Sequence, residues 1–543
     1  MREWLDELLQ DGHDEKQFRE HFFSLEDPVQ QITDLEKWRR IQLRFVSSRI
    51  DEIRLLSGEQ YSNIDHFLPE LLQNADDNDY SDGVQPLVKL TLDREYFRLD
   101  NNEKGLTAKD LLAITDAAAS TKIRKPTGAS FIGEKGIGFK SVFSVADYVD
   151  IHSGPYSFRL NNDEFIIPHL IDSVGSTGTT GTQILLRLKA GNPAIPRKLS
   201  DRLRTLCESS QEFILFLQKV GRLEIEDRIS SSPVEITVTR DTEKGVYVVR
   251  EGGIDRTYRA FRYDESIPAR VVRDRFRKLD ADLRLDVIIA ASKPATRNVP
   301  ASGRLFCFLP TEVWTGTPLH VQIDAKTITN RANIADFAAS KWNATIFGNL
   351  ASHFLKAYVN LTKDPEFAPR LPEYMPYQVS GKNLGNDDIQ KIMIEVENRL
   401  PSEALTLDRN GQYFPSKWVK MLPKNVEDIL YEDKFERALS RQYVATEGEA
   451  GRDFGPEDSF TLLDRRWAKR YRNQMKSLGV EEVSAEVCIG MLNEGPPESV
   501  ARGNVRRVRR FLTTIMDFSE SSGFEFFIDR FSVVRLGSCM VHR

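Results

Sequence analysis

The segment Glu70-Leu-Leu-Gln-Asn74 holds the first residues whose types and spacing could do chemistry. On a helix, Glu70 and Asn74 are one turn apart and lie on the same face. A carboxylate can take a proton from water, and an amide oxygen is a hard ligand suited to Mg²⁺. Together they are what water-driven phosphoryl transfer needs. Taken alone, however, an ordinary exposed helix face is the favoured interpretation.

A second candidate follows at the end of an alternating segment, in Asp100-Asn-Asn-Glu-Lys-Gly105. A carboxylate or an amide there could accept a hydrogen bond from the exocyclic amine of a purine. Gly105 would let the chain bend close to the base. Taken alone, a run rich in Asn and Gly is more typical of a surface turn.

Three glycines, Gly133, Gly136 and Gly138, form a third candidate directly before a helical pattern. At this spacing, backbone N–H groups and the positive end of the helix can bind phosphate. A dinucleotide site is excluded because no βαβ strand precedes the glycines and no acidic residue follows in the right place, and the position of Lys140 excludes a P-loop. A fourth candidate is Gly181-Thr182 before a strand, whose hydroxyl could bond a purine or a bound water.

Hydrophobic patterns predict the elements that position these four candidates. Apolar residues recur with helical spacing in the first sixty or so positions and again around the candidates, whereas other segments alternate as strands do. The expected helices are 65–77, 110–119 and 197–223, and the expected strands are 88–92, 95–100, 147–152, 156–160 and 182–188. Because these strands follow one another like hairpins, the pattern predicts an α+β domain rather than βαβ units.

A second α+β region is expected from about residue 224 to residue 360. Its strands are expected at 234–240, 246–250, 285–289, 304–309 and 319–323, and an amphipathic helix at 342–361. Four prolines between Pro365 and Pro376 predict a linker. The remainder of the chain is expected to be mainly helical.

Composition bounds the class of protein. The 543 residues have a formal net charge of −6, with 40% hydrophobic and 29% charged residues, which fits a soluble globular protein of roughly three to four domains. The four cysteines and eight histidines are scattered, so neither a disulfide scaffold nor a zinc site is expected. We expect no membrane span and no signal peptide. The basic run 502–510 is better explained by a solvated helix face than by contacts to a phosphate backbone.

The order and spacing of the four candidates resemble the GHKL superfamily of ATPases, which share the Bergerat nucleotide-binding fold and include gyrase, histidine kinases and the ninety-kilodalton heat-shock chaperones. The stretch Phe131-Ile-Gly-Glu-Lys-Gly-Ile-Gly-Phe-Lys-Ser-Val-Phe-Ser-Val-Ala-Asp147 is similar to the glycine segment of the chaperone branch almost residue for residue. Within that branch, residues 71–78, 101–105, 120–122 and 133–141 are most similar to the sacsin and NO VEIN type proteins. The resemblance covers about residues 55–190.

The resemblance implies a role for each matching position. Glu70 would be the general base, Asn74 the Mg²⁺ ligand, and Asp77 would border the purine pocket. The other positions would surround ATP: Gly133, Gly136 and Gly138 along the triphosphate, Phe139 beside the nucleotide, Ser120, Thr121 and Lys122 in a mobile lid, and Thr182 on the pocket floor.

The second candidate departs from the family pattern, which is usually Asp-x-Gly-x-Gly. Counting back from Gly105, the position that reads the purine falls on Asn101, and the first glycine position is occupied by Glu103. Asp100 would serve only if the turn were one residue longer. Either side chain can accept one hydrogen bond from the amine, but Asn101 would do so without charge.

The second α+β region resembles the chaperone middle domain over a shorter stretch. Phe306-Cys-Phe-Leu-Pro-Thr311 is similar to its core strand, and Gln322-Ile-Asp-Ala-Lys-Thr-Ile-Thr-Asn-Arg331 to the loop that brings an arginine to the γ-phosphate. The resemblance makes Arg331 the candidate and Lys326 a weaker one. A cation there would stabilise charge in the transition state. A solvated loop arginine is an equal alternative.

Together these inferences predict a segmented chain. The segments are an N-terminal helical segment over 1–55, a GHKL ATP-binding domain over 56–195, connecting helices over 196–230, a chaperone-like middle domain over 231–362 and a C-terminal region of unknown role over 363–543. The fold class is α+β, with helices on a mixed sheet in the ATPase domain.

We expect an Mg²⁺-dependent protein that binds ATP and hydrolyses it slowly. Its lid and middle domain would close on the nucleotide to remodel a protein client in the cytoplasm or nucleus, with a homodimer formed on closure and no membrane or nucleic-acid partner. Two alternatives stay open. One is a nucleotide-binding scaffold or signalling module with little hydrolysis, and the other is the same fold recruited to a different small-molecule reaction.

Overall fold

The computed structural model divides the chain into two compact units. The first comprises residues 1–350 and 383–389, and the second comprises residues 351–382 and 390–543. The structure describes residues 15–42, 67–116, 138–172, 181–209, 213–230, 232–276, 279, 281–294, 302–328, 332–424, 427, 460–483, 488, 513–514 and 517. Within these residues, no helix is both long enough and apolar enough to cross a bilayer.

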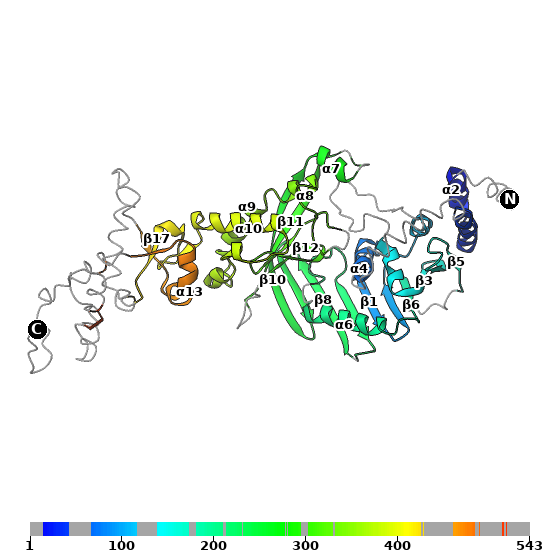
Figure 1. Cartoon of the computed structure of the whole chain (residues 1–543), viewed down its shortest axis with the longest axis horizontal. Coiled ribbons are helices and arrows are strands. Elements are labelled where there is room, and N and C mark those ends of the chain that lie inside the picture. The colour runs from blue at the N-terminus through cyan, green and yellow to red at the C-terminus, as the bar shows by residue number, and fades with distance from the viewer. Residues whose placement is uncertain are drawn as a thin grey trace, which may run out of the picture. The chain divides into compact units, whose positions relative to one another are not determined.

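Strands from the first 190 residues build one part of a mixed sheet in the first unit (Figure 1). They are β1 (Leu87–Leu92), β2 (Tyr96–Asn101), β3 (Ala146–Ser153), β4 (Tyr156–Asn161), β5 (His169–Leu170) and β6 (Thr182–Leu188). The strands expected from alternating hydrophobicity are all present. They pair antiparallel in the order β1-β2-β6-β3-β4-β5, as the hairpin-like pattern predicted.

The second α+β region continues the same sheet. Its strands are β8 (Ser232–Asp241), β9 (Val246–Glu251), β10 (Ile254–Ile267), β11 (Leu283–Ser292), β12 (Arg304–Cys307), β13 (Leu309–Trp314) and β14 (Leu319–Gln322). Strand β7 (Arg222–Asp227) joins the two parts, because it pairs in parallel with β1 and antiparallel with β8. The result is one sheet of 14 strands, in the order β13-β12-β14-β11-β10-β9-β8-β7-β1-β2-β6-β3-β4-β5.

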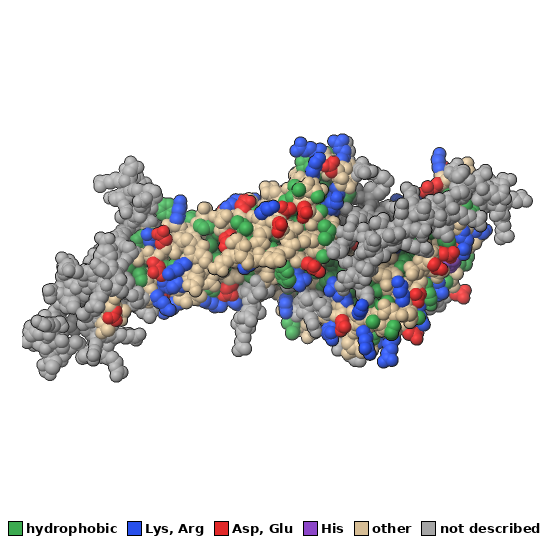
Figure 2. All heavy atoms as spheres, in the orientation of Figure 1, with side chains coloured by type: hydrophobic (Ala, Val, Ile, Leu, Met, Phe, Trp, Pro, Cys, Tyr) green, Lys and Arg blue, Asp and Glu red, His purple; other side chains and the backbone are tan. Residues whose placement is uncertain are grey.

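Helices of the first unit pack on this sheet and bury a hydrophobic core that extends from Phe18 to Leu309. They are α2 (Glu15–Ser24), a helical stretch over 28–42, α4 (Phe67–Asp77), α5 (Ala108–Ile114), the 3₁₀ helix η1 (Gly138–Ser144) and α6 (Ile195–Ser209). Two further helices of this unit, α7 (Ala269–Arg275) and α8 (Lys341–Ile346), contribute no residue to that core. On the face drawn in Figure 2, basic and acidic side chains are interspersed rather than sorted by sign.

Four sequence-based expectations are wrong in their elements. The single strand expected over 304–309 is broken at Phe308, where β12 has ended and the antiparallel β13 begins. The helix expected over 197–223 ends at Ser209, and its last two residues belong to β7. The single helix expected over 342–361 is two, α8 and α9 (Leu350–Leu361), separated by a short break that contains Gly348. The long strand β10 was not expected, because its many charged residues hide the alternating pattern.

The second unit contains short elements. They are most of α9, η2 (Ala368–Glu373), η3 (Val379–Gly381), most of α10 (Asp387–Arg399), η4 (Leu400–Ser402), β15 (Thr406–Leu407), β16 (Tyr413–Phe414), η5 (Ser416–Trp418), β17 (Val419–Met421), β18 (Thr461–Leu462), α13 (Arg465–Ser477) and β19 (Glu481–Glu482). The prolines that predicted a linker lie in or beside η2, which is packed: the indole of Trp467 donates to the Pro369 carbonyl at 3.1 Å, and the Tyr471 hydroxyl hydrogen-bonds Glu373. The basic run 502–510 lies outside the described residues.

Candidate functional site

Helix α4 presents the first candidate residues on its less buried side. Its apolar residues, among them Phe67, Leu71 and Leu72, face the sheet. The Phe67 ring packs edge-on against the Phe97 ring of β2, with 5.4 Å between the ring centres. Glu70 and Asn74 are half-buried and one turn apart. The helix therefore displays a carboxylate and an amide oxygen in the arrangement that the spacing predicted.

These oxygen donors could hold a hard cation together with a bound ligand. Mg²⁺ prefers oxygen, keeps several waters and commonly takes only one or two protein carboxylates plus substrate phosphates. Among the described residues, no group of three or more His, Cys, Asp or Glu side chains could hold a metal ion alone. The donor set of Glu70 and Asn74 thus fits a cation that arrives with a phosphate ligand, rather than a permanently bound one.

The end of α4 is fastened by a buried aspartate. Asp76 is 1% exposed, and its two carboxylate oxygens accept the backbone N–H groups of Gln218 at 2.7 Å, Lys219 at 2.8 Å and Val220 at 2.8 Å. Burial raises the pKa of Asp76, while these three donors and the positive charge of Arg240 oppose the shift. One side chain therefore holds a segment that lies more than 140 positions further along the chain.

Two basic side chains also hold residues 214–220 in place. The Lys219 ammonium donates to the carbonyls of Asp77 at 3.2 Å and Asn78 at 2.6 Å, where a cation also suits the negative end of α4. Arg240 of β8 donates through Nε to the Leu215 carbonyl at 3.0 Å, and through Nη2 to the carbonyls of residues 214 and 220. Burial lowers the pKa of Arg240 to about 10. Residues 214–220 are thus anchored both to α4 and to the sheet.

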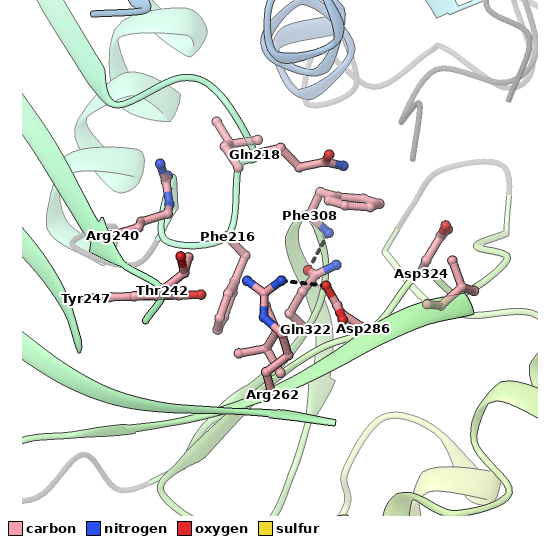
Figure 3. A pocket seen from close by; sticks show the side chains of 13 residues that line it. Phe216, Gln218, Arg240, Thr242, Tyr247, Arg262, Asp286, Phe308, Gln322 and Asp324 are labelled. Atoms are coloured by element: carbon pink, nitrogen blue, oxygen red, sulfur yellow. Dashed lines mark hydrogen bonds and ion pairs between the residues drawn. The ribbon is translucent and has the colours of Figure 1, made fainter. Parts of the chain in front are cut away.

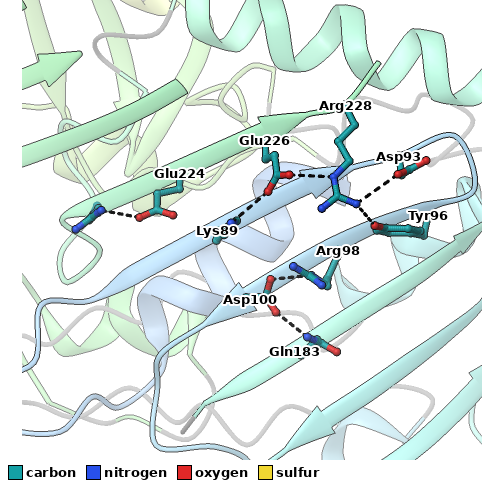
Figure 4. Close-up of polar contacts among 10 residues, drawn as sticks. Lys89, Asp93, Tyr96, Arg98, Asp100, Gln183, Glu224, Glu226 and Arg228 are labelled. Atoms are coloured by element: carbon teal, nitrogen blue, oxygen red, sulfur yellow. Dashed lines mark hydrogen bonds and ion pairs between the residues drawn. The ribbon is translucent and has the colours of Figure 1, made fainter. Parts of the chain in front are cut away.

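The second candidate lies at the end of β2, where alternation separates its two possible base readers. Asn101 is 5% exposed on the side of the strand that α4 covers, and its Oδ1 accepts the Tyr80 hydroxyl at 2.9 Å. Burial raises the pKa of Tyr80, so the phenol stays a donor. Asp100 points to the other side of β2, where it accepts Arg98 Nε at 2.8 Å and Gln183 Nε2 at 2.8 Å (Figure 4). The structure brings Asn101, and not Asp100, next to the end of α4.

The glycines of the second and fourth candidates each pack closely against the backbone of another segment. Gly105 has φ +92°, and a Cβ there would lie 2.9 Å from the backbone nitrogen of Gly154. A Cβ on Gly181 would lie 2.1 Å from the Asn101 carbonyl oxygen. Both positions require glycine because backbone approaches backbone. Thr182 is directly opposite Asn101 in the β2–β6 register, and its hydroxyl hydrogen-bonds that of Ser153.

The third candidate is described only from Gly138 onward, where η1 begins. Phe139 is half-buried, and Lys140 is 3% exposed, with its ammonium 2.6 Å from the Asp116 carbonyl and 4.7 Å from the centre of the Phe165 ring. Burial lowers the pKa of Lys140 to about 7; the nearby Arg39 adds to this shift and Asp116 opposes it. Lys140 therefore ties η1 to the residue that follows α5.

The N-terminal helical stretch 28–42 reaches the same place. Arg39 donates through Nη2 to the Leu112 carbonyl at 3.1 Å, and the same nitrogen lies 3.6 Å from the Asp116 carboxylate. Gln31 accepts the Tyr156 hydroxyl at 2.7 Å. This segment, which the sequence analysis placed before the predicted ATP-binding domain, is thus packed against α5 and β4.

The remaining predicted residues lie outside the described part of the chain. They are Ser120, Thr121, Lys122, Gly133, Gly136 and Arg331. Asp77 is buried at the end of α4. Lys326 is exposed, and its backbone N–H and carbonyl both bond the side chain of Asn343.

Sequence reasoning missed the anchors of this site. Asp76 follows the first candidate closely but was given no role, and Lys219, Arg240 and Tyr80 were not singled out. Only Asp76 carried a local signal, an acidic residue at a helix end facing the same way as the buried Leu72. The others depend on contacts between distant segments, for which one sequence has no pattern.

The chain was compared with known proteins. No family model matches it. Over 340 residues, or 59% of this chain, it is 27% identical to Protein NO VEIN of Arabidopsis thaliana. That alignment covers 12% of the relative's length, so the chain spans only a small part of the curated protein that it matches. Among solved structures, an N-terminal domain of a DNA repair protein is 11% identical, with a TM-score of 0.32, over 57% of this chain and 99% of that one.

Proposed function

We propose that the chain is a GHKL-type module with a Bergerat fold, which binds Mg²⁺-ATP and hydrolyses it slowly. The observation that carries the proposal is the convergence of three separate candidates. Asn101 lies opposite Thr182 and against Gly181, and the Tyr80 hydroxyl lies within hydrogen-bond distance of both Asn101 and the Ala75 carbonyl of the helix that presents Glu70 and Asn74. The resemblance of the sequence to the sacsin and NO VEIN type proteins supports the same assignment.

In this proposal each residue acts through its own chemistry. The half-buried Glu70 carboxylate accepts a proton from the attacking water, and the Asn74 amide oxygen orients the hydrated cation. Mg²⁺, when bound with ATP, supplies positive charge to the phosphates. Asn101 faces the purine with an uncharged amide. Lys122, the glycines 133, 136 and 138, and Arg331 have the roles that the resemblance implies.

The contacts of α4 support a cycle in which nucleotide changes the conformation of the chain. Asp76 and Lys219 fasten the end of α4 to residues 214–220, and Arg240 fastens the same residues to β8. A shift of α4 on binding nucleotide would therefore pull on the sheet of the middle region. We propose that this movement acts on a protein client in the cytoplasm or nucleus.

The test is calorimetric Mg²⁺-ATP binding together with ATP turnover, measured on wild type and Glu70→Ala. Glu70→Ala is expected to keep binding and to lose about 10²-fold or more in turnover, because it lacks the base. Glu95→Ala is the matched control, since that side chain is 67% exposed and pairs only with Arg187 among the described ion pairs. Turnover by Glu70→Ala at the wild-type rate would contradict the assignment of the base.

A second candidate function is a nucleotide-binding scaffold with little hydrolysis. It is favoured by Asn101, whose Oδ1 already accepts the Tyr80 hydroxyl where the family usually places a charged aspartate. Binding by wild type without any turnover would support this scaffold. If wild type bound no ATP at all, both proposals would fail, and the fold would serve a different small-molecule reaction.

A further inference from the structure

A cavity in the middle region of the first unit has no role in the proposed nucleotide site. It lies over strands β8 to β11 and β14, beside residues 216–218, and has a volume of about 250 Å³ (Figure 3). Sites for drug-sized ligands usually measure about 300–1,000 Å³. The cavity is therefore suited to a small metabolite and is too small for a nucleoside triphosphate.

Charges of both signs lie side by side on the floor of the cavity. Arg262 of β10 donates through Nη1 to Asp286 Oδ2 of β11 at 2.6 Å, and the two side chains are 46% and 41% exposed. Asp264 is directly opposite Asp286 in the strand register. Burial and the neighbouring Asp264 raise the pKa of Asp286, and Arg262 opposes this shift. A ligand ammonium placed here would relieve the repulsion between the two carboxylates.

The rest of the lining combines apolar walls with a few polar groups. The rings of Phe216 and Phe308 and the side chain of Ile288 line the cavity, as do the Thr242 hydroxyl and the Gln322 amide (Figure 3). Gln322 Oε1 accepts the Phe308 N–H at 2.7 Å, so its Nε2 is the end left to donate. This is the usual make-up of a site for a small organic molecule.

The backbone at Phe308 is strained. Its φ is +68°, in a region that bulky L residues rarely adopt, and its side chain is 8% exposed. The hydrogen bond to Gln322 holds this conformation in place. Such strain costs about 1–3 kcal/mol and clusters at ligand sites, so it is a second feature that points to binding here.

We propose that the cavity binds an α-amino acid with an apolar side chain. Its carboxylate would contact Arg262 and the Gln322 amide, and its ammonium would contact Asp286. Its side chain would lie between Phe216 and Phe308. An α-amino acid carries opposite charges on neighbouring atoms and can add a counter-charge to both members of the Arg262–Asp286 pair, whereas a singly charged ligand can add one to only a single member. This inference does not depend on the proposed ATP site.

The test is calorimetric titration of the full chain with L-phenylalanine and L-leucine. Their decarboxylated and deaminated analogues are titrated in parallel: phenethylamine and 3-phenylpropionate, and 3-methylbutylamine and 4-methylpentanoate. We expect one or both amino acids to bind, and each analogue of a bound amino acid to bind at least about tenfold more weakly, because one charged contact is lost. An analogue that binds as tightly as its parent, or no binding by either amino acid, would overturn the proposal.

Variants locate the site. The Arg262 and Asp286 side chains are each about half exposed. Arg262→Gln and Asp286→Asn are each expected to weaken binding of the amino acid about tenfold or more. Arg250→Gln is the matched control, because Arg250 makes the same kind of cross-strand pair with Asp255 at 2.6 Å, between β9 and β10, and does not line the cavity. Equal affinity in Arg262→Gln and wild type, or an equal loss in Arg250→Gln, would overturn the assignment to this cavity.

Discussion

Similar polar side chains lie in opposite surroundings on the two sides of the sheet at β1, β2 and β6: those on the inner side belong to α4 and η1, and those on the outer face belong to the strands themselves. On the inner side, Asp76 and Lys140 are 1% and 3% exposed and bond mainly to backbone groups. On the outer face, Asp100 contacts the side chains of Arg98 and Gln183, and Lys89 lies 3.2 Å from Glu226 of β7 (Figure 4). The same side-chain types thus fasten segments on one side and form a network of partly exposed contacts on the other.

This difference indicates which contacts contribute most to the stability of this unit and to holding its distant segments together. An exposed ion pair contributes about 0–1 kcal/mol, because water and salt screen it and two long side chains must be ordered. A buried charge costs several kcal/mol when its partners are removed. Substitutions on the inner side should therefore have large effects and local structural consequences, whereas equivalent substitutions on the outer face should be nearly silent.

Asp76→Ala should have the largest effect. It leaves the N–H groups of residues 218–220 without their acceptor, and we expect a loss of about 3–5 kcal/mol in the free energy of unfolding. Urea unfolding of the full chain measures the loss, and hydrogen exchange at Gln218, Lys219 and Val220 should rise first. A loss below about 1 kcal/mol would show that this carboxylate does not hold the segment.

Lys140 should make the free energy of unfolding depend on pH. Its pKa is lowered from 10.5 to about 7 in the folded chain, so between these values the unfolded state binds a proton that the folded state does not. The free energy of unfolding should therefore rise with pH across this window, by up to about 1.4 kcal/mol per pH unit, and the contribution should be flat below about pH 7.

Lys140→Met is the variant that isolates this contribution. Unfolding measured from pH 6 to pH 9.5 should show a shallower rise for Lys140→Met than for wild type. Lys89→Met, on the outer face, is the matched control and should retain the wild-type slope. Parallel pH curves for wild type and Lys140→Met would rule out a buried, proton-shedding lysine.

Asn101→Ala should have an intermediate effect and bears on the ATP proposal. It removes one of two acceptors of the partly buried Tyr80 hydroxyl, which keeps the Ala75 carbonyl at 2.7 Å, and we expect about 1 kcal/mol less stability. If Asn101 also faces the purine, the affinity for Mg²⁺-ATP should fall. The affinity for GTP should stay unchanged, because guanine has no exocyclic amine at the ring position where adenine has one. Unchanged ATP affinity in a folded Asn101→Ala protein would remove Asn101 from the nucleotide site.

Asp100→Asn should have the smallest effect. It weakens one partly exposed contact with Arg98, and we expect a change of about 0.5 kcal/mol or less, which should shrink further at high salt. ATP affinity should stay at the wild-type value. A large loss of ATP affinity would reverse the comparison and make Asp100, rather than Asn101, the residue that reads the base.

Local patterns predicted much of the first unit. Alternating hydrophobicity located strands such as β1, β2 and β6, and four-residue spacing placed Glu70 and Asn74 on one face of a helix. The glycines at 105 and 181 were recognised from sequence spacing. The pattern missed two strands: β10 is rich in charge along its length, and the first two residues of β7, whose burial does alternate, were assigned to a predicted helix.

By itself, the sequence determined which segments become strands and helices, and that Asp100 and Asn101 must point to opposite sides of β2, because these properties depend on neighbours within a few residues. Only the tertiary structure decided which side α4 covers, and that β7 joins the two regions into one sheet. It also decided that Asp76 bonds residues 142 to 144 positions away. Such contacts depend on how distant segments pack to bury apolar surface and satisfy buried polar groups, which no local pattern records.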